Sequence, residues 1–289
     1  MLTRTPLGLN GAVNKPTLFR VALVPCLVCI GPLLPLAASA QPAADRERAS
    51  IVLGAFITDR QSNTRLDSDS GGDGTDIDME DDLGLESSTN VARLGGYVWL
   101  GRRHRLDGAY FDLSRSASIP IRETIDFGDQ TFQINTTLNT ESNLKIIKAD
   151  YTFAVLAKDR GFLGLTAGLY IAETGFVLSQ PTLGRAESED VTAPLPLFGL
   201  RGDYAINDRI TLSGAAQVFA YSTDELDGHL TDFYVGADYG FGKRMAVGLA
   251  YNQVSMNIGA QDSSGFNGRL DWGYDGFLLY FKVDLGSRN

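Results

Sequence analysis

The chain has 289 residues, and its 25 Lys and Arg against 35 Asp and Glu give a formal net charge of −10. This acidic balance argues against a nucleic-acid partner, because phosphate backbones are bound through an excess of Lys and Arg. Beyond residue 40, no stretch reaches the roughly 18 consecutive apolar residues of a membrane-spanning helix. A membrane span in this part of the chain would therefore have to be built from strands.

The first 40 residues predict a cleaved export signal. They carry basic residues but no acidic ones, followed by an apolar stretch from Val21 to Leu36. Ala38-Ser39-Ala40 supplies the small side chains that a signal peptidase requires, which predicts cleavage before Gln41. The alternative, an anchor helix, is disfavoured because prolines interrupt the apolar run. We therefore expect a signal peptide over 1–40 and one barrel domain over 41–289.

Removal of this signal would change both the cysteine content and the charge. Cys26 and Cys29 both precede residue 40, so the mature chain would contain no thiol and no cysteine-ligated metal. It would keep 22 Lys and Arg against 35 Asp and Glu, a net charge of −13. Such a charge repels lipopolysaccharide phosphates unless the carboxylates face a barrel interior or bind divalent cations.

The hydrophobic pattern after the signal has a period of two residues, which predicts strands. The first three predicted strands, 51–59, 91–100 and 105–118, alternate less regularly than the others. The next runs from Asn143 to Leu156, with Ile147 and Tyr151 on one face and Lys148 and Asp150 on the other. The same alternation predicts six further strands in chain order, at 163–172, 196–206, 210–218, 231–241, 245–252 and 277–285.

The connections between these ten segments alternate between long and short. We expect long acidic or glycine-rich loops at 61–89, 119–140, 179–192, 223–230 and 259–267, separated by tight turns. Outer-membrane barrels have an even strand number, short periplasmic turns and longer extracellular loops. The predicted fold class is therefore an all-β, transmembrane, antiparallel up-and-down barrel of about ten strands, with eight or 12 as the alternatives.

A soluble periplasmic barrel would show the same alternation, with the two faces exchanged. The export signal and the aromatic residues near predicted strand ends favour the membrane barrel, since such residues form girdles at the lipid boundary. These aromatic residues are Tyr97, Trp99, Tyr151, Tyr204, Tyr239, Trp272, Tyr274 and Tyr280. The lipid-facing side is then expected to carry Phe153, Leu165, Leu212, Val235 and Phe281.

Four stretches carry a resemblance to known proteins, namely 81–85 (DDLGL), 112–116 (DLSRS), 195–206 and 268–282. They resemble a widespread family of proteobacterial outer-membrane barrels whose function is undescribed. The general plan is similar to that of OmpA-like and OmpW-like small barrels, from which a ten-strand chain departs by one hairpin. The resemblance covers nearly the whole mature chain and implies location and fold, but it carries no catalytic residue.

Charged residues on the polar strand faces predict a network inside the barrel. In a narrow lumen these side chains must pair, because an unpaired buried charge costs several kcal/mol. A salt-bridge plug is expected, with a charge-lined narrow ion path as the alternative. The predicted network consists of Asp112, Lys148, Asp150, Glu173, Arg201, Asp203, Asp232, Asp238, Lys282 and Asp284.

The loop from Asp67 to Asp82 is the most acidic stretch. Asp67, Asp69, Asp73 and Asp78 follow part of a calcium-loop spacing, although Gly71 replaces one usual ligand and the last position is not Glu. The alternatives are a calcium site and a solvated acidic loop.

One motif is suited to hydrolysis. Asp227-Gly228-His229 would stand near the outer end of a strand, and an Asp-oriented His can act as a general base on water. Ten-strand proteases of the omptin type resemble this plan, but the required second acidic pair could only be guessed, for instance as Asp126 and Asp129. The other histidine, His104, is expected at the opposite end.

These observations favour a non-enzymatic outer-membrane protein with a structural or surface-interaction role in the envelope and no cofactor. A narrow channel for small solutes or ions and an omptin-like rim hydrolase are the alternatives. The expected partners are outer-membrane lipid, lipopolysaccharide and the barrel-assembly machinery, with divalent cations at the acidic loop and no nucleic acid.

Overall fold

The computed structural model describes residues 47–68, 73–222, 226–260 and 268–287. The predicted signal peptide over 1–40 lies outside these residues. In the described part, no helix is long and apolar enough to cross a membrane.

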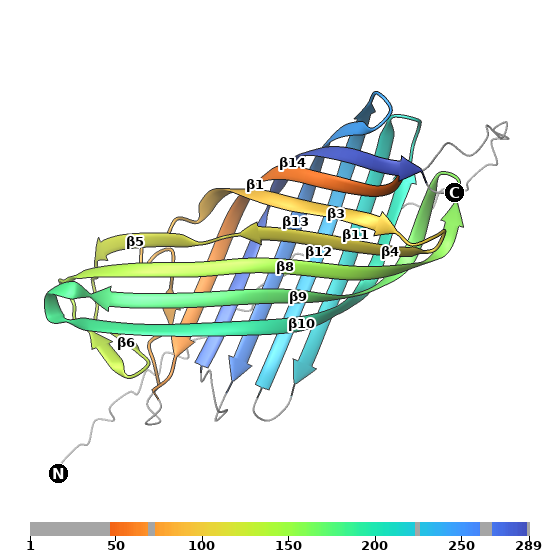
Figure 1. The fold of residues 1–289 in the computed structure, drawn as a ribbon. Helices are drawn as coiled ribbons and strands as arrows, with labels where there is room; N and C mark the ends of the chain where they lie inside the picture. Colours follow the sequence, from red (N-terminus) through yellow and green to blue (C-terminus); the bar gives the residue numbers. More distant parts are fainter. Residues whose placement is uncertain (1–46, 69–72, 223–225, 261–267, 288–289) are drawn as a thin grey trace, which may run out of the picture. The chain divides into compact units, whose positions relative to one another are not determined.

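Ten antiparallel strands form a closed wall, in which each strand pairs with its neighbours in sequence and β14 pairs with β1 (Figure 1). The closing ladder runs from Glu47↔Ser287 to Leu66↔Gly268. The ten-strand, all-β barrel predicted from the sequence is therefore confirmed. The wall consists of β1 (Glu47–Leu66), β3 (Ser88–Trp99), β4 (His104–Asp112) continued by β5 (Arg115–Pro120), β8 (Thr137–Lys158), β9 (Gly161–Gln180), β10 (Arg185–Ala205), β11 (Ile210–Ser222), β12 (Leu226–Phe241), β13 (Met245–Ala260) and β14 (Gly268–Ser287).

The two ends of the barrel differ. At one end of the barrel, which we call the turn end, the first and last residues of the wall, Glu47 and Ser287, pair with each other. The connections at this end are short segments at 100–103, 159–160, 206–209 and 242–244. At the opposite loop end, the connections carry the short strand β2 (Ile77–Asp78) and a hairpin of β6 (Ile125–Phe127) and β7 (Gln130–Phe132). Figure 1 shows β5, β8, β9 and β10 extending far toward the loop end.

Several segments predicted as loops are strands. The segment 179–192 belongs largely to β9 and β10, which are joined by a single turn of 3-10 helix at Pro181–Leu183. The predicted loops 61–89 and 119–140 likewise contain strand ends. These predictions were wrong because the strands continue beyond the lipid, where polar side chains cover their outer face.

In the half of the barrel next to the turn end, apolar side chains point outward and polar ones inward. Every wall strand contributes at least one large exposed hydrophobic residue, and we call this surface the apolar band. Its members include Leu53, Leu94, Leu106, Ile147, Leu165, Leu200, Leu212, Val235, Leu249 and Leu279. The predicted lipid-facing side is thus exposed on the outside, although Phe153 is partly covered.

In the half next to the loop end the two faces exchange character. In β8, the outer face changes from Ile147 to Lys145 and the inner face from Lys148 to Ile146. In β14, the outer face changes from Phe277 to Asp275. The loop half therefore has a polar outside and an apolar core, as the hydrophobic effect requires of a barrel surrounded by water.

A second hydrophobic cluster covers the loop end. It joins the strand tips to β2 and the β6–β7 hairpin, so both are packed down over the barrel rather than extended into solvent. Its members are Leu66, Ile77, Met79, Leu83, Leu85, Ile121, Ile125, Phe127, Phe132, Leu138, Phe176 and Leu178.

The wall separates along one seam near the loop end. β10 pairs with β9 over its whole length, but its ladder with β11 ends at Phe198↔Val218. Because Pro194 and Pro196 leave the β9 ladder uninterrupted, their nitrogens must face β11, where neither can donate a hydrogen bond. The two prolines thus end the ladder with β11, and beyond it this edge of β10 has no partner strand among the residues that the structure describes.

The predicted aromatic girdle is partly wrong. Tyr151, Tyr204 and Tyr239 are exposed on the outer face. The other five aromatic residues, Tyr97, Trp99, Trp272, Tyr274 and Tyr280, point into the barrel. Sequence distance from a strand end does not reveal which face a residue occupies.

Candidate functional site: a charged chamber inside the barrel

The turn half of the barrel encloses a chamber with a volume of about 440 Å³. Turn residues such as Arg160, Arg209 and Arg244 line one end of it, so the chamber reaches the turn end. Its inner end is lined by Lys148 and Asn252.

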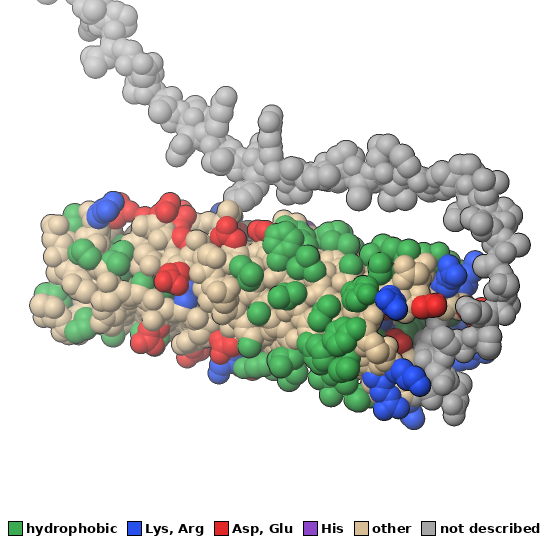
Figure 2. All heavy atoms as spheres, turned by 90° about the horizontal axis from the view of Figure 1, so that it is seen from above, with side chains coloured by type: hydrophobic (Ala, Val, Ile, Leu, Met, Phe, Trp, Pro, Cys, Tyr) green, Lys and Arg blue, Asp and Glu red, His purple; other side chains and the backbone are tan. Residues whose placement is uncertain are grey.

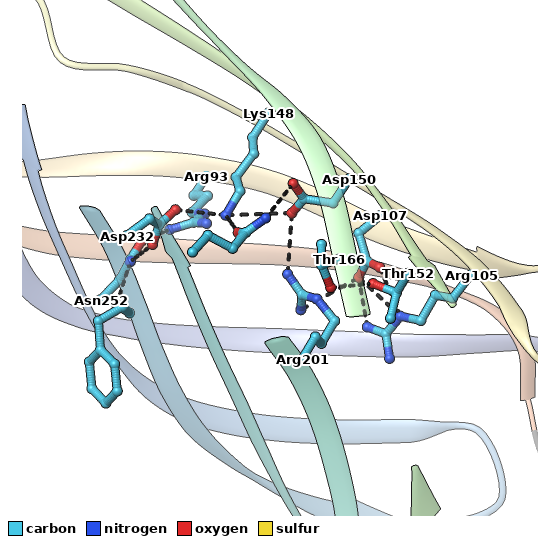
Figure 3. Close-up of polar contacts among 12 residues, drawn as sticks. Arg93, Arg105, Asp107, Lys148, Asp150, Thr152, Thr166, Arg201, Asp232 and Asn252 are labelled. Atoms are coloured by element: carbon cyan, nitrogen blue, oxygen red, sulfur yellow. Dashed lines mark hydrogen bonds and ion pairs between the residues drawn. The ribbon is translucent and has the colours of Figure 1, made fainter. Parts of the chain in front are cut away.

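The charged side chains of the chamber wall are paired with one another (Figure 3). Arg105 donates to both carboxylate oxygens of Asp107 and, through Nη1, to Asp203 Oδ2 at 2.6 Å. The guanidinium of Arg105 also lies 3.8 Å from the centre of the Tyr97 ring. Arg201 connects this group to a deeper one, because its Nη2 lies 3.3 Å from Asp150 Oδ2. These contacts join β4, β8 and β10 across the interior.

A second layer centred on Lys148 lies deeper. Its Nζ donates to Asp232 Oδ2 at 2.6 Å and to Gln217 Oε1 at 2.5 Å, and lies 3.4 Å from Asp150 Oδ2. Gln217 Nε2 donates to Asp150 Oδ1 at 3.0 Å, and Asn252 Nδ2 donates to Asp232 Oδ1 at 2.8 Å. This layer connects β8, β11, β12 and β13, so it spans the lumen (Figure 3).

A third group lies on β12 and β14 near the chamber wall. Lys282 Nζ is 2.6 Å from Asp238 Oδ2, and Tyr280 donates its hydroxyl proton to the same carboxylate. The Tyr280 ring lies over Gly248, where an added Cβ would come within 2.1 Å of the ring. Glycine at position 248 is therefore what lets the Tyr280 ring reach Asp238.

An apolar core closes the barrel above the Lys148 layer. Phe56, Phe111 and Tyr274 contact one another edge to face, with ring centres 5.3 to 6.1 Å apart. Tyr170 and Leu197, both completely buried, belong to the same cluster. Arg93 links this core to the polar layer, because it donates to Asn252 Oδ1 at 2.8 Å and its guanidinium lies 4.9 Å from the centre of the Phe111 ring.

Eight of the ten residues of the predicted network face the interior, namely Lys148, Asp150, Arg201, Asp203, Asp232, Asp238, Lys282 and Asp284. Asp112 and Glu173 instead are exposed on the outer face, and this corrects the sequence-based assignment. Both lie in the loop half, where the outer face is polar and the inner face carries Phe111 and Ala172.

Sequence reasoning missed Arg93, Arg105, Asp107, Gln217 and Asn252 as members of the network. Arg105 and Asp107 belong to a segment whose alternation is less regular than that of the other strands. Their spacing of two residues, with the exposed Leu106 between them, was the available signal.

The acidic loop uses its carboxylates for local hydrogen bonds. Asp67 pairs with Arg65 and accepts the backbone N–H of Gly74, and Asp78 accepts the backbone N–H groups of Glu80 and Asp81. Among the described residues, no three His, Cys, Asp or Glu are placed to hold a metal ion. Asp69 lies outside the described residues, whereas Asp73 is described and exposed.

The predicted hydrolytic residues are spread over the molecule. Asp227 and His229 are exposed on the outer face of β12, where His229 pairs in register with Ala220 and Asn257. Asp126 and Asp129 accept hydrogen bonds from Thr131 and Ser68. They lie at the β6–β7 hairpin. His104 is at the turn end, 2.6 Å from the Tyr151 hydroxyl.

No family model and no curated protein matches the chain. Among solved structures it is similar to the outer membrane protease OmpT from Escherichia coli, with 13% identity and a TM-score of 0.54 over 86% of this chain and 99% of that one. Similarity to Ail of Yersinia pestis (10% identity, TM-score 0.33, 80% and 97% covered) and to the Pseudomonas putida toluene transporter TodX (10%, 0.32, 84% and 92%) supports no further argument.

The likeness to OmpT concerns the fold alone. Together with the closed wall and the exposed apolar band, it places this chain among the outer-membrane β-barrels. A specific relation to OmpA-like or OmpW-like barrels stays a prediction.

Proposed function

We propose that this outer-membrane β-barrel is a non-enzymatic envelope protein with a closed lumen and a loop end that makes contacts at the cell surface. The observation that carries the proposal is the double closure of the interior. The Lys148 layer spans the lumen, and the apolar core containing Phe56 and Phe111 fills the space above it. Water and ions would have to break both layers to pass.

The loop end supports the surface role. In outer-membrane barrels the longer connections are extracellular, and here the second hydrophobic cluster packs the described segments around β2 and the β6–β7 hairpin against the strand tips. The outer wall below carries exposed carboxylates such as Glu141, Glu173 and Asp190. Contact with lipopolysaccharide phosphates would then require divalent cations between the two sets of anions.

The absence of enzymatic activity remains part of the proposal. It is supported by the position of His229, which is exposed on the outer face of β12, and by the hydrogen bonds that Asp126 and Asp129 make to Thr131 and Ser68. Peptide hydrolysis by the wild type that disappears in His229→Ala would contradict this part.

Planar-bilayer recordings test the closure. Folded wild-type protein, checked by heat-modifiable migration on a gel, is expected to give no steady conductance. The triple variant Phe56→Ala/Phe111→Ala/Lys148→Ala, which truncates both layers and is folded by the same criterion, serves as the opened comparison. Steady unitary currents from the wild type would instead favour the narrow channel.

A lipopolysaccharide binding assay tests the surface role. Binding is expected with magnesium, to fall when a chelator is added, and to fall in the variant Glu141→Gln/Glu173→Gln/Asp190→Asn. Binding that is unchanged by both the chelator and these substitutions would contradict the proposed contact between lipopolysaccharide and these carboxylates.

A further inference from the structure

The four short connections at the turn end carry a concentration of positive charge. They contain six basic residues but two acidic ones, Asp159 and Asp208, and Lys158, the last residue of β8, adds a seventh basic residue beside them. Their side chains are all exposed. We call the seven basic residues the basic ring, and they are Arg102, Arg103, Lys158, Arg160, Arg209, Lys243 and Arg244.

The basic ring differs from the cations inside the barrel in its partners. Arg105, Lys148, Arg201 and Lys282 each lie within 4.0 Å of a carboxylate oxygen. In the part of the chain that the structure describes, no ion pair is formed by the arginines of the ring or by Lys243. The contact found for Arg209 is to a neutral group, the Tyr239 hydroxyl at 3.4 Å. The ring therefore places positive charge at the turn end, and four of its members, Arg160, Arg209, Lys243 and Arg244, also line the mouth of the chamber.

The position of the ring matches the edge of a lipid layer. Exposed hydrophobic residues of the apolar band adjoin the cations in sequence, such as Leu100 before Arg102, Leu156 before Lys158, and Met245 after Arg244. Figure 2 shows Lys and Arg side chains gathered beside the hydrophobic surface at one end and acidic side chains over the other. Cations with apolar neighbours of this kind sit at the depth of lipid headgroups.

We propose that the basic ring binds the phosphate groups of anionic phospholipids in the periplasmic leaflet. Short turns of outer-membrane barrels lie on the periplasmic side, and this leaflet consists of phospholipid. Several cations around one circumference can each contact a headgroup of the lipid shell, and guanidinium groups bind phosphate oxygens in pairs. An acidic periplasmic protein is a less suitable partner, because the apolar band beside the cations is covered by lipid.

Thermal unfolding in mixed micelles tests this assignment. The folded mature chain in an uncharged detergent is titrated with phosphatidylglycerol, phosphatidylcholine or inorganic phosphate, and the unfolding midpoint is followed by circular dichroism. Phosphatidylglycerol is expected to raise the midpoint more than phosphatidylcholine does, with inorganic phosphate giving no comparable rise. The apparent affinity for phosphatidylglycerol is expected to fall at least about tenfold in Arg102→Gln/Lys243→Gln/Arg244→Gln.

A matched control removes three exposed cations from the loop half, as Arg122→Gln/Lys145→Gln/Arg269→Gln. This variant has the same net charge as the test variant, and its preference for phosphatidylglycerol is expected to stay at the wild-type value. Equal responses of the wild type to both lipids would overturn the proposal. So would an equal loss in the two triple variants, or a midpoint rise that inorganic phosphate reproduces.

Discussion

Lys148 on β8 and Asp232 on β12 form a 2.6 Å ion pair across the interior of the barrel. Three strands separate β8 from β12 along the wall, so this contact ties opposite parts of the circumference together. Both side chains are buried, and both have further hydrogen-bond partners.

Substitution Lys148→Met is expected to destabilise the barrel by about 3–5 kcal/mol, because Asp232 is left buried without its cation. The free energy of unfolding is measured by urea titration of the protein folded in lipid vesicles. The double variant Lys148→Met/Asp232→Leu is expected to lose less than the single one, since it leaves no unpaired charge at this position. A single variant as stable as the wild type would show that the ion pair is not buried.

Substitution Phe111→Ala tests the apolar core above the charged layer. Phe111 is 1% exposed and contacts both Phe56 and Tyr274, so its truncation should cost about 3–5 kcal/mol. The outward-facing Phe277, which is 56% exposed, provides the control. If Phe277→Ala costs as much as Phe111→Ala in the same unfolding experiment, the loop half of the interior is not a packed core.

Arg60 donates a hydrogen bond to the backbone at the break between β4 and β5. This buried side chain donates through Nη1 to the Leu113 carbonyl and through Nη2 to Thr89 Oγ1 at 2.6 Å. In Arg60→Met the amides of β5 are expected to exchange with deuterium at least roughly tenfold faster, because hydrogen bonds from a charged donor contribute about 1.5–3 kcal/mol each. Substitution of the exposed Arg122 by Met should leave this exchange unchanged. If the β5 amides exchange at the wild-type rate in Arg60→Met, Arg60 does not stabilise the break between β4 and β5.

Pro196 ends the ladder between β10 and β11. The next hydrogen-bonded pair beyond Phe198↔Val218 would join position 196 to Ala220, and proline has no N–H for it. In Pro196→Val, the amide created at position 196 is expected to be protected from hydrogen exchange, as one more ladder bond would require. Fast exchange at this position would mean that something other than the prolines separates the strands.

The outer face of the turn half could be predicted from the sequence, because contact with lipid requires apolar side chains at every second position of each strand. Residues such as Ile147 and Leu165 alternate with polar or small neighbours, so period, face and strand number follow together. The tight turns were found for the same reason, since they separate runs with clear alternation.

The loop half could not be read by that rule. Asp112 and Glu173 alternate with Phe111 and Ala172 just as lumen residues alternate with lipid-facing ones, but here water lies outside. Alternation identifies the two faces of a strand, and the surroundings decide which of them is buried. Likewise, Arg105 pairs with Asp203 on β10, a strand distant in sequence, so this part of the pairing inside the chamber depends on closure of the wall.

The exchange of faces in β8 also sets how deeply the protein sits in the membrane. This strand has 22 residues, about twice the 9–11 that a tilted strand needs to cross the hydrocarbon. A deeper position would bring Glu173 into acyl chains, and a shallower one would expose Leu165 to water. The barrel is therefore held at one immersion depth, with the upper part of its wall standing above the bilayer as a collar that keeps its rim clear of the headgroups.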